Sequence, residues 1–490
     1  MAANVALNLV GQLAPALAAV LAMPFLVSGL GAERLGVLSL AWVAVGAFTL
    51  LDFGLGRSLT LEVSRKLALG RGEDVPAVVQ GTLIVLAVVG VGGAAALAVA
   101  RVRLLAALGV PAALAPEVEY AILGVCLAAP FMTVSAGMRG VLEAYGRFDL
   151  SNLVRVPLGV LTYLGPALAL PFSRSVAVSV GVLVTVRVLG AAAFLVCVRA
   201  LAGGGSGWHV EWHHLRAVVS SGWWMNVANL AGVALTYVDR LILGAMLSLA
   251  AVAFYATPQE LVGKLTVVPV ALSAVLFPAL SSAQARQSTD LVGLFSRGLT
   301  YTFVLLLPVV MVAAALAPEW LGAWLGGEFA RESARPAQWL LLSVLLQSLA
   351  ITPLNLLQAI GHAPVTAWLQ LLQLPLFVCA MWWAVSVAGI TGAAGVWAAR
   401  MLLDLTLLLA MARRYAPTVS GAIRSWVIVV PLTAAWFVAV TRLEALAARG
   451  GLLAIGLLAF AVYAPRLVGG NDLTQLRALL TRRFRPQGAR

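Results

Sequence analysis

The chain is a succession of long apolar runs separated by short polar breaks. The first run, residues 1–32, contains no ionisable side chain and is long enough to cross the roughly 30 Å hydrocarbon layer of a membrane as a helix. It lacks the cationic start and the cleavage site of a secretory signal, and another apolar run follows at once. Cutting the chain at its polar breaks predicts about fourteen transmembrane helices, which we expect at 4–28, 35–56, 77–99, 118–138, 153–172, 175–198, 218–246, 250–280, 298–317, 337–360, 364–387, 390–412, 425–441 and 450–468.

The composition agrees with this pattern. Of the 490 residues, 62% are hydrophobic and 10% are charged, and the mean hydropathy is +1.00, which is far from the balance of a soluble domain. We therefore predict an all-α membrane protein whose surroundings are the lipid bilayer. The net charge of +13 does not indicate nucleic-acid binding, because the cations are scattered between apolar runs rather than gathered on one face with interleaved aromatic residues.

The loops on the two sides of the membrane differ in positive charge. If the N-terminus is cytoplasmic, 20 Lys and Arg side chains fall on the inside and 8 on the outside. Loops rich in Lys and Arg tend to remain in the cytoplasm. We therefore expect both termini to face the cytoplasm.

The remaining four cations lie within predicted transmembrane helices. A cation at this depth costs at least about 2.5 to 3.5 kcal/mol, so each should face a protein interior or a wet cavity and have a partner. These four residues are Arg187, Arg240, Lys264 and Arg400. Lys264 is the most unusual of them, because the chain has only one other lysine, Lys66.

Acidic residues lie close to three of these four cations along the chain. Glu260 and Lys264 are four residues apart, as are Arg400 and Asp404, so each pair shares one helix face. Asp239 directly precedes Arg240. The two side chains lie about 100° apart around the helix, so each should pair with a group on another helix. Two interpretations stay open: buried ion pairs that fix the helix register, or the charged lining of a ligand cavity.

Asp52 is a further candidate at the end of the second predicted helix, in the segment LLDFGLGRS. It is either an interfacial carboxylate near Arg57 or a gating or cation-coupling group. The two glycines that follow it would let the helix bend or let neighbouring helices approach closely. The sequence does not decide between these roles.

A glycine-rich stretch at 203–207 separates two halves of similar length. The segment WHVEWHH follows at Trp208, but Val210 stands where the zincin pattern needs a glutamate. Cys126, Cys197 and Cys379 fall inside apolar runs without paired spacing. We therefore predict no metal site and no cofactor. The predicted parts are an N-terminal six-helix lobe at 1–200, a cytoplasmic linker at 201–216, a C-terminal six-helix lobe at 217–415, a transmembrane hairpin at 424–468 and a basic cytoplasmic tail at 469–490.

Three segments of the chain carry a resemblance to a known family. They are LVSGLGAERLGVLSLAWVAVGAFTLLDFGLGRSLTLEVSR from Leu26, RGVLEAYGRFDLSNLVRV from Arg139, and YVDRLILGAMLSLAAVAFYATPQELVGKL from Tyr237 with VLFPALSS after it. In these segments the chain resembles the polysaccharide exporters, the lipid-linked oligosaccharide flippases of the multidrug, oligosaccharidyl-lipid and polysaccharide flippase superfamily. The resemblance is clear up to the tenth predicted helix. In the rest of the chain it lies mainly in the hydropathy pattern.

The resemblance implies two six-helix lobes arranged as a V around a central cavity that works by alternating access. Similar family members flip undecaprenyl-diphosphate-linked units of O-antigen, capsule or exopolysaccharide from the cytoplasmic to the periplasmic leaflet. The implied function is therefore that of a transporter rather than an enzyme, with a lipid-linked oligosaccharide as substrate. An ion gradient and a polysaccharide polymerase are the further candidate partners. Many members lack a counterpart of the hairpin at 424–468.

The charged residues inside the predicted helices suit such a substrate. A diphosphate needs cations in a low-dielectric site, and arginine can grip a phosphate with two parallel hydrogen bonds. The candidate substrate-binding residues are the four buried cations Arg187, Arg240, Lys264 and Arg400. The candidate polar walls for the sugars are Tyr237, Tyr255, Gln259, Asn226 and Asn229, although side chains of these types in transmembrane helices more often serve helix packing. The candidate charge partners or coupling carboxylates are Asp52, Asp239, Glu260 and Asp404.

Two other functions compete with saccharide transport. A drug or cation antiporter of the same superfamily would have a cavity lined by unpaired carboxylates rather than by cations. A saccharide ligase or lipid-linked glycosyltransferase would present a large loop outside the membrane or a clustered acid and base. The outside segment at 318–336 is short and the sequence contains no Asp-x-Asp pair, so the enzyme is the weaker alternative.

Overall fold

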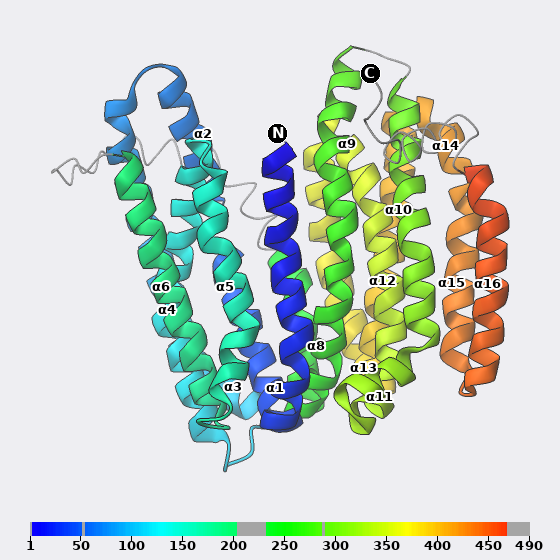
Figure 1. Cartoon of the computed structure of the whole chain (residues 1–490), viewed down its shortest axis with the longest axis horizontal. Coiled ribbons are helices and arrows are strands. Elements are labelled where there is room, and N and C mark those ends of the chain that lie inside the picture. The colour runs from blue at the N-terminus through cyan, green and yellow to red at the C-terminus, as the bar shows by residue number, and fades with distance from the viewer. Residues whose placement is uncertain (1, 51–53, 203–231, 287–289, 468–490) are drawn as a thin grey trace, which may run out of the picture. The chain divides into compact units, whose positions relative to one another are not determined.

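The computed structural model describes residues 2–50, 54–202, 232–286 and 290–467, and these residues form helices and no strands (Figure 1). The chain divides into two units. The first comprises Met1–Lys264 and Ala367–Val396, and the second comprises Leu265–Thr366 and Trp397–Arg490. Each unit is described by itself. The boundaries of the lobes, linker, hairpin and tail given above stay predictions.

The first unit is organised around a long bent helix. It contains α1 (Ala2–Leu50), α2 (Leu55–Ala68), α3 (Val75–Ala107), α4 (Ala115–Ala144), α5 (Phe148–Ala169), α6 (Val176–Ala202), a helix at residues 232–246 and α8 (Leu249–Gly263). Helix α1 packs on α4, α5, α6 and α8, and α4 also packs on α2, α3 and α6. Leu59, Met138 and Phe194 belong to the apolar core between α2, α4 and α6.

Glycine allows two long helices to change direction. Helix α1 is interrupted at Gly31, whose φ of 73° and ψ of 170° are accessible to glycine but strained for other residues. The helix α13 (Ala363–Tyr415) is interrupted at Ala388 and Gly389, where the φ of the glycine is 55°. Both interruptions fall in gaps between predicted transmembrane helices, the first between 4–28 and 35–56 and the second between 364–387 and 390–412.

The second unit is built around α12 (Gly327–Ala359), which packs against four other helices and whose membrane-length segment is 83% buried. Its neighbours are α9 (Val267–Ala285), α10 (Asp290–Ala315), α11 (Ala317–Leu325) and α15 (Trp426–Arg442). The unit also contains the last part of α13, α14 (Ser420–Arg424) and α16 (Leu446–Leu467). In Figure 1, α15 and α16 lie side by side.

The chain is an all-α membrane protein, as predicted. In the described ranges, nine helices are long and apolar enough to cross a membrane, or ten if the bent pair α14 and α15 counts as one span. Bent helices such as α1 and α13 each count once although each contains two predicted spans, so the predicted fourteen remains a prediction. One predicted span, 250–280, is not a continuous α-helix, because a 3₁₀ turn at Lys264–Thr266 separates α8 from α9.

The segment predicted as an outside loop at 318–336 is largely helical. It holds α11 and the first turns of α12, and Arg331 and Arg335 lie on α12 rather than in a loop. Arg449, also predicted in an outside loop, lies near the start of α16 and is only 3% exposed. Its guanidinium donates hydrogen bonds to the carbonyl oxygen of Ala315 at 2.7 Å and to both carboxylate oxygens of Glu319 at 3.0 and 2.7 Å. This contact fastens α16 to α10 and α11.

We expect this contact to make the stability of the protein depend on acid. The hydrogen bonds from Arg449 hold the pKa of Glu319, on the short helix α11, below its ordinary value of 4.5. A carboxylate with a lowered pKa in the folded state stabilises that state above its ordinary pKa, and the contribution is lost as the pH falls through the folded value. The thermal unfolding midpoint in detergent should therefore fall as the pH drops below the ordinary carboxyl pKa of 4.5. The Glu319→Gln variant should show a smaller fall, and identical pH profiles would contradict the role of this carboxylate.

Candidate functional site

Three of the candidate charged residues of the first unit lie on two consecutive helices. The helix at 232–246 carries Asp239 and Arg240, and α8 carries Glu260. Helix α8 begins at Ser248, whose side-chain oxygen accepts a hydrogen bond from the backbone N–H of Ala251 at 3.0 Å. This N-cap ends the turn between the two helices. The chain then runs back along 232–246, so that residues near 240 meet residues near 260.

Asp239 is completely buried and is held by three donors. Its Oδ1 accepts the backbone N–H of Arg240 at 2.8 Å. Its Oδ2 accepts the hydroxyl of Tyr255 at 2.8 Å and the amide Nε2 of Gln259 at 3.1 Å. A buried carboxylate requires such donors. Tyr255 and Gln259, expected as walls for sugars, therefore serve first to hold Asp239 in place.

The guanidinium of Arg240 faces α8 rather than its neighbour in the chain. Its Nε donates to Oε1 of Gln259 at 3.0 Å, and its Nη2 donates to Oε1 of Glu260 at 2.9 Å. The side chain is 5% exposed. Its Nη1 is also buried and has no hydrogen-bond partner in the described part of the chain. Arg240 thus has a donor left over beside its ion pair.

Lys264 reaches the same carboxylate from the end of α8. Its Nζ lies 3.6 Å from Oε2 of Glu260, across one helical turn as the spacing predicts, and donates to the hydroxyl of Tyr163 at 3.0 Å. That hydroxyl in turn donates to Oε2 of Glu260 at 2.9 Å. The side chain of Lys264 is 31% exposed. Glu260 is therefore shared by a buried arginine and a partly open lysine.

Tyr163 was not among the candidates from the sequence. It lies on α5, and Trp42 of α1 packs against it with ring centroids 5.2 Å apart. The indole Nε1 of Trp42 donates to the carbonyl oxygen of Thr162 at 3.3 Å. The polar pair Thr162–Tyr163 in an otherwise apolar segment is the signal that could have identified it. We call Asp239, Arg240, Gln259, Glu260, Lys264, Tyr163 and Tyr255 the charged cluster.

The charged cluster is electrically balanced. It contains two carboxylates, Asp239 and Glu260, and two cations, Arg240 and Lys264, so its formal net charge is zero. The predicted cationic cavity stays a prediction, and in the charged cluster both cations lie beside Glu260, one of the acidic residues named as their partners. Their remaining capacity lies in donors: the buried Nη1 of Arg240 has no hydrogen-bond partner among the described residues, and the ammonium of Lys264 is partly open.

Of the other predicted site residues, Arg187 lies in the first unit, Arg400 and Asp404 lie in the second, and the rest include residues outside the described ranges. Arg187, on α6, donates from Nη2 to the hydroxyl of Thr162 at 2.8 Å, and its buried Nε has no hydrogen-bond partner among the described residues. Arg400 and Asp404 belong to the second unit, where the Cζ of Arg400 lies 5.2 Å from the ring centroid of Trp397. Asp52, Asn226 and Asn229 lie outside the described residues, as do the histidines that follow Trp208.

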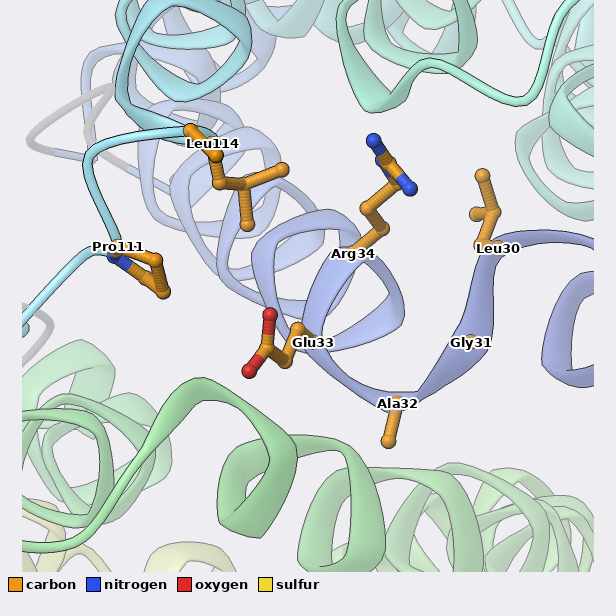
Figure 2. A pocket seen from close by; sticks show the side chains of 8 residues that line it. Leu30, Gly31, Ala32, Glu33, Arg34, Pro111 and Leu114 are labelled. Atoms are coloured by element: carbon orange, nitrogen blue, oxygen red, sulfur yellow. The ribbon is translucent and has the colours of Figure 1, made fainter.

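A pocket of the first unit lies at the bend of α1, and Figure 2 shows the residues that line it around Gly31. It has a volume of about 280 Å³. Arg34 donates to both oxygens of Glu117 at 3.1 and 2.8 Å, and Glu117 also accepts the hydroxyl of Ser175 and the backbone N–H of Val176. Arg34 is thus already engaged in joining α1, α4 and the start of α6. In the described ranges, no three His, Cys, Asp or Glu side chains gather as a metal site would require.

The fold is that of membrane transporters of the MOP superfamily. An inward-facing multidrug-resistance MATE transporter is 15% identical, covers 83% of this chain and 95% of its own, and gives a TM-score of 0.71. An outward-facing MATE transporter covers 85% of this chain and 95% of its own at 15% identity, with a TM-score of 0.60. A MOP superfamily transporter from Pyrococcus furiosus, described as having a binding pocket of reverse polarity, is 14% identical, with a TM-score of 0.56 and coverage of 86% and 95%.

The sequence identifies the family within this fold. The family model "Polysaccharide biosynthesis protein" matches residues 1–284, which is more than half of the chain, and the chain belongs to that family. A Shigella flexneri protein named "Putative O-antigen transporter" is 26% identical over 405 residues, which cover 82% of this chain and 95% of the relative.

Proposed function

We propose that the protein flips a lipid-linked oligosaccharide from the cytoplasmic to the periplasmic leaflet of the bacterial inner membrane by alternating access. The name of the Shigella flexneri relative and the family support saccharide transport. The observation that carries the proposal is the sharing of Glu260 between Arg240 and Lys264, with donors left free on both cations. In this proposal the substrate is linked through a diphosphate, and the charged cluster binds that diphosphate.

The proposed binding step is an exchange of partners. A phosphate oxygen takes the place of Glu260 at the ammonium of Lys264, which is 3.6 Å from the carboxylate and partly open. Arg240 remains fixed by Gln259 and offers Nη1 to the same ligand. Charge-assisted hydrogen bonds of this kind are among the stronger ones in proteins. The apolar tail stays in the bilayer throughout.

The balanced charge of the cluster gives an ion gradient a role. A bound diphosphate makes the cluster negative, and a buried carboxylate that loses its cationic partner is costly in a low-dielectric site. Uptake of a proton or a metal cation at Glu260 or Asp239 relieves this cost. We therefore propose that transport is coupled to an ion gradient. Asp52, Asp404, Arg187 and Arg400 stay proposed as further coupling or binding residues.

The proposed orientation follows from the loop charges, with both termini in the cytoplasm. The two six-helix lobes and the central cavity of the V also stay proposals that rest on the resemblance. A polysaccharide polymerase is the proposed partner that would use the flipped unit. None of these features is needed for the chemistry of the charged cluster.

A drug or cation antiporter is the competing function. Its specific support is the pair of buried carboxylates, Asp239 and Glu260, together with the fold shared with MATE transporters. Both carboxylates are engaged by donors from Tyr255, Gln259, Arg240 and Tyr163. A cationic drug would have to compete with Arg240 for Glu260, and this favours an anionic substrate.

Reconstitution tests the proposed function directly. Proteoliposomes that contain the chain should move a fluorescent undecaprenyl-diphosphate-linked oligosaccharide between leaflets, and empty liposomes should not. The Cys126→Ala variant serves as the control and should match the wild type, because Cys126 lies on α4 without a partner in a disulfide. Transport of ethidium without transport of the lipid-linked saccharide would favour the antiporter and overturn the proposal.

A further inference from the structure

The first unit contains a second polar cavity, of about 480 Å³, between the end of α1, α2, α4, the helix at 232–246 and α13. Its volume lies in the range of small-molecule sites. The residues that matter for its chemistry are Arg57, Thr60, Arg139, Glu143, Thr236 and Gln370. We call this cavity the arginine pocket.

The two arginines come from neighbouring helices and keep much of their binding capacity. Arg57, on α2, is exposed and forms no ion pair with a described residue. Arg139, on α4, has its Nε 3.8 Å from Oε1 of Glu143, and both side chains are only half-buried. Such a long, solvated pair is weak. With two guanidinium groups and one carboxylate, the described lining residues of the pocket have a formal charge of +1.

A close approach of α2 and α4 brings these arginines to one pocket. A Cβ atom on Gly140 would lie 2.7 Å from the carbonyl oxygen of Gly56, so position 140 accepts only glycine at this helix separation. The hydroxyl of Thr60 donates to the carbonyl oxygens of Gly56 and Gly140, at 2.9 and 3.0 Å. The wall of the pocket is therefore fixed, while the arginine side chains extend from it.

The arginine pocket lies next to the charged cluster along the same two helices. On the helix at 232–246, Thr236 lines the pocket and Arg240 follows one turn later on the same face. On α1, Thr49 lines the pocket, Gly46 faces the hydroxyl of Tyr237, and Trp42 packs on Tyr163 of the cluster. Successive turns of these helices thus lead from the pocket to the cluster.

We propose that the arginine pocket is a separate docking site for the phosphate-bearing headgroup of a lipid, occupied before the headgroup reaches the charged cluster. Two guanidinium groups on adjacent helices suit a diphosphate, whose oxygens can accept two parallel hydrogen bonds from each. Arg57 and Arg139 lie on the side predicted to be cytoplasmic, where the headgroup starts. The inference rests on the proposed function and adds a first binding step to it.

Calorimetric titration of the chain in phosphatidylcholine nanodiscs tests the pocket, with farnesyl diphosphate as the probe. The Lys264→Ala background weakens the charged cluster, so that the remaining binding reports the arginine pocket. Adding Arg57→Ala and Arg139→Ala should weaken this binding at least about tenfold, the loss expected for removing charge-assisted hydrogen bonds. Adding Arg57→Lys and Arg139→Lys should retain part of it. The matched control is Arg65→Ala, an exposed arginine on α2 outside the pocket.

Two further ligands identify the source of the phosphate. Inorganic pyrophosphate should bind more weakly than farnesyl diphosphate, because only the lipid is concentrated at the membrane surface. Phosphatidylglycerol in the nanodisc should compete poorly, because it has a single phosphate. Pyrophosphate binding as tight as that of the lipid, or full competition by phosphatidylglycerol, would overturn the assignment to a diphosphate lipid.

The inference and the proposed function can fail separately. Unchanged affinity in the double alanine variant overturns the arginine pocket, whereas transport of the lipid-linked saccharide by the wild-type chain still supports the proposed function. The reverse result, loss of binding in the double variant but no saccharide transport by the wild type, supports the pocket as a diphosphate site and overturns the proposed function.

Discussion

Replacement of Lys264 with alanine is expected to abolish saccharide export while leaving the protein folded and inserted in the membrane. Lys264 is partly exposed and lies at the end of α8, where the α-helix gives way to a 3₁₀ turn. Without it, Glu260 keeps its hydrogen bonds from Arg240 and Tyr163, so no buried charge is left unpaired. The loss should therefore fall on ligand binding rather than on stability.

The measurement is surface polysaccharide in cells that depend on the variant chain, together with its thermal unfolding midpoint in detergent. We expect export to fall at least about tenfold, which corresponds to the loss of one charge-assisted interaction, and the unfolding midpoint to change little. Lys264→Arg preserves the charge and should retain part of the export. Normal export by the Lys264→Ala variant would show that Lys264 does not belong to the substrate-binding site.

The sequence predicted the fold class and the bend of α1 because both depend on local properties. Long apolar runs require helices in lipid, since backbone polar groups have no other partners there. Gly31 lies between two such runs, and glycine permits the change of direction. Arg449 was misplaced for the opposite reason. The distribution of charge among the loops does not predict that Arg449 pairs with Glu319, which lies 130 residues away in the sequence.

The candidate site was predictable only in part. The i,i+4 spacing identified the contact between Glu260 and Lys264, because both residues lie on one helix. The adjacent Asp239 and Arg240 were expected to look to other helices, and α8 supplies their partners. Tyr163 could not be found by spacing, since α5 meets α8 through tertiary packing alone.

Arg240→Ala should have the largest effect of any single change in the charged cluster. It leaves Glu260 with the more distant ammonium of Lys264 and the hydroxyl of Tyr163, and it removes the buried guanidinium that donates to Gln259. Removing one partner of a buried ion pair costs about 3–5 kcal/mol. We therefore expect a large fall of the unfolding midpoint as well as loss of export. Arg240→Lys should recover little, because the single ammonium nitrogen of lysine cannot occupy the positions of both Nε and Nη2, which bind Gln259 and Glu260.

A compensating double variant separates the structural role of Arg240 from its role in binding. Arg240→Met combined with Glu260→Met removes the cation and the carboxylate together, and the charged cluster keeps a formal charge of zero through Asp239 and Lys264. Replacing a buried ion pair with apolar residues of similar volume is often neutral or stabilising, so the unfolding midpoint should return toward the wild-type value. Export should remain absent, because the guanidinium that offers Nη1 to a phosphate oxygen is gone. If export returns together with stability, Arg240 and Glu260 serve only to hold the helix at 232–246 against α8, and the diphosphate must bind elsewhere.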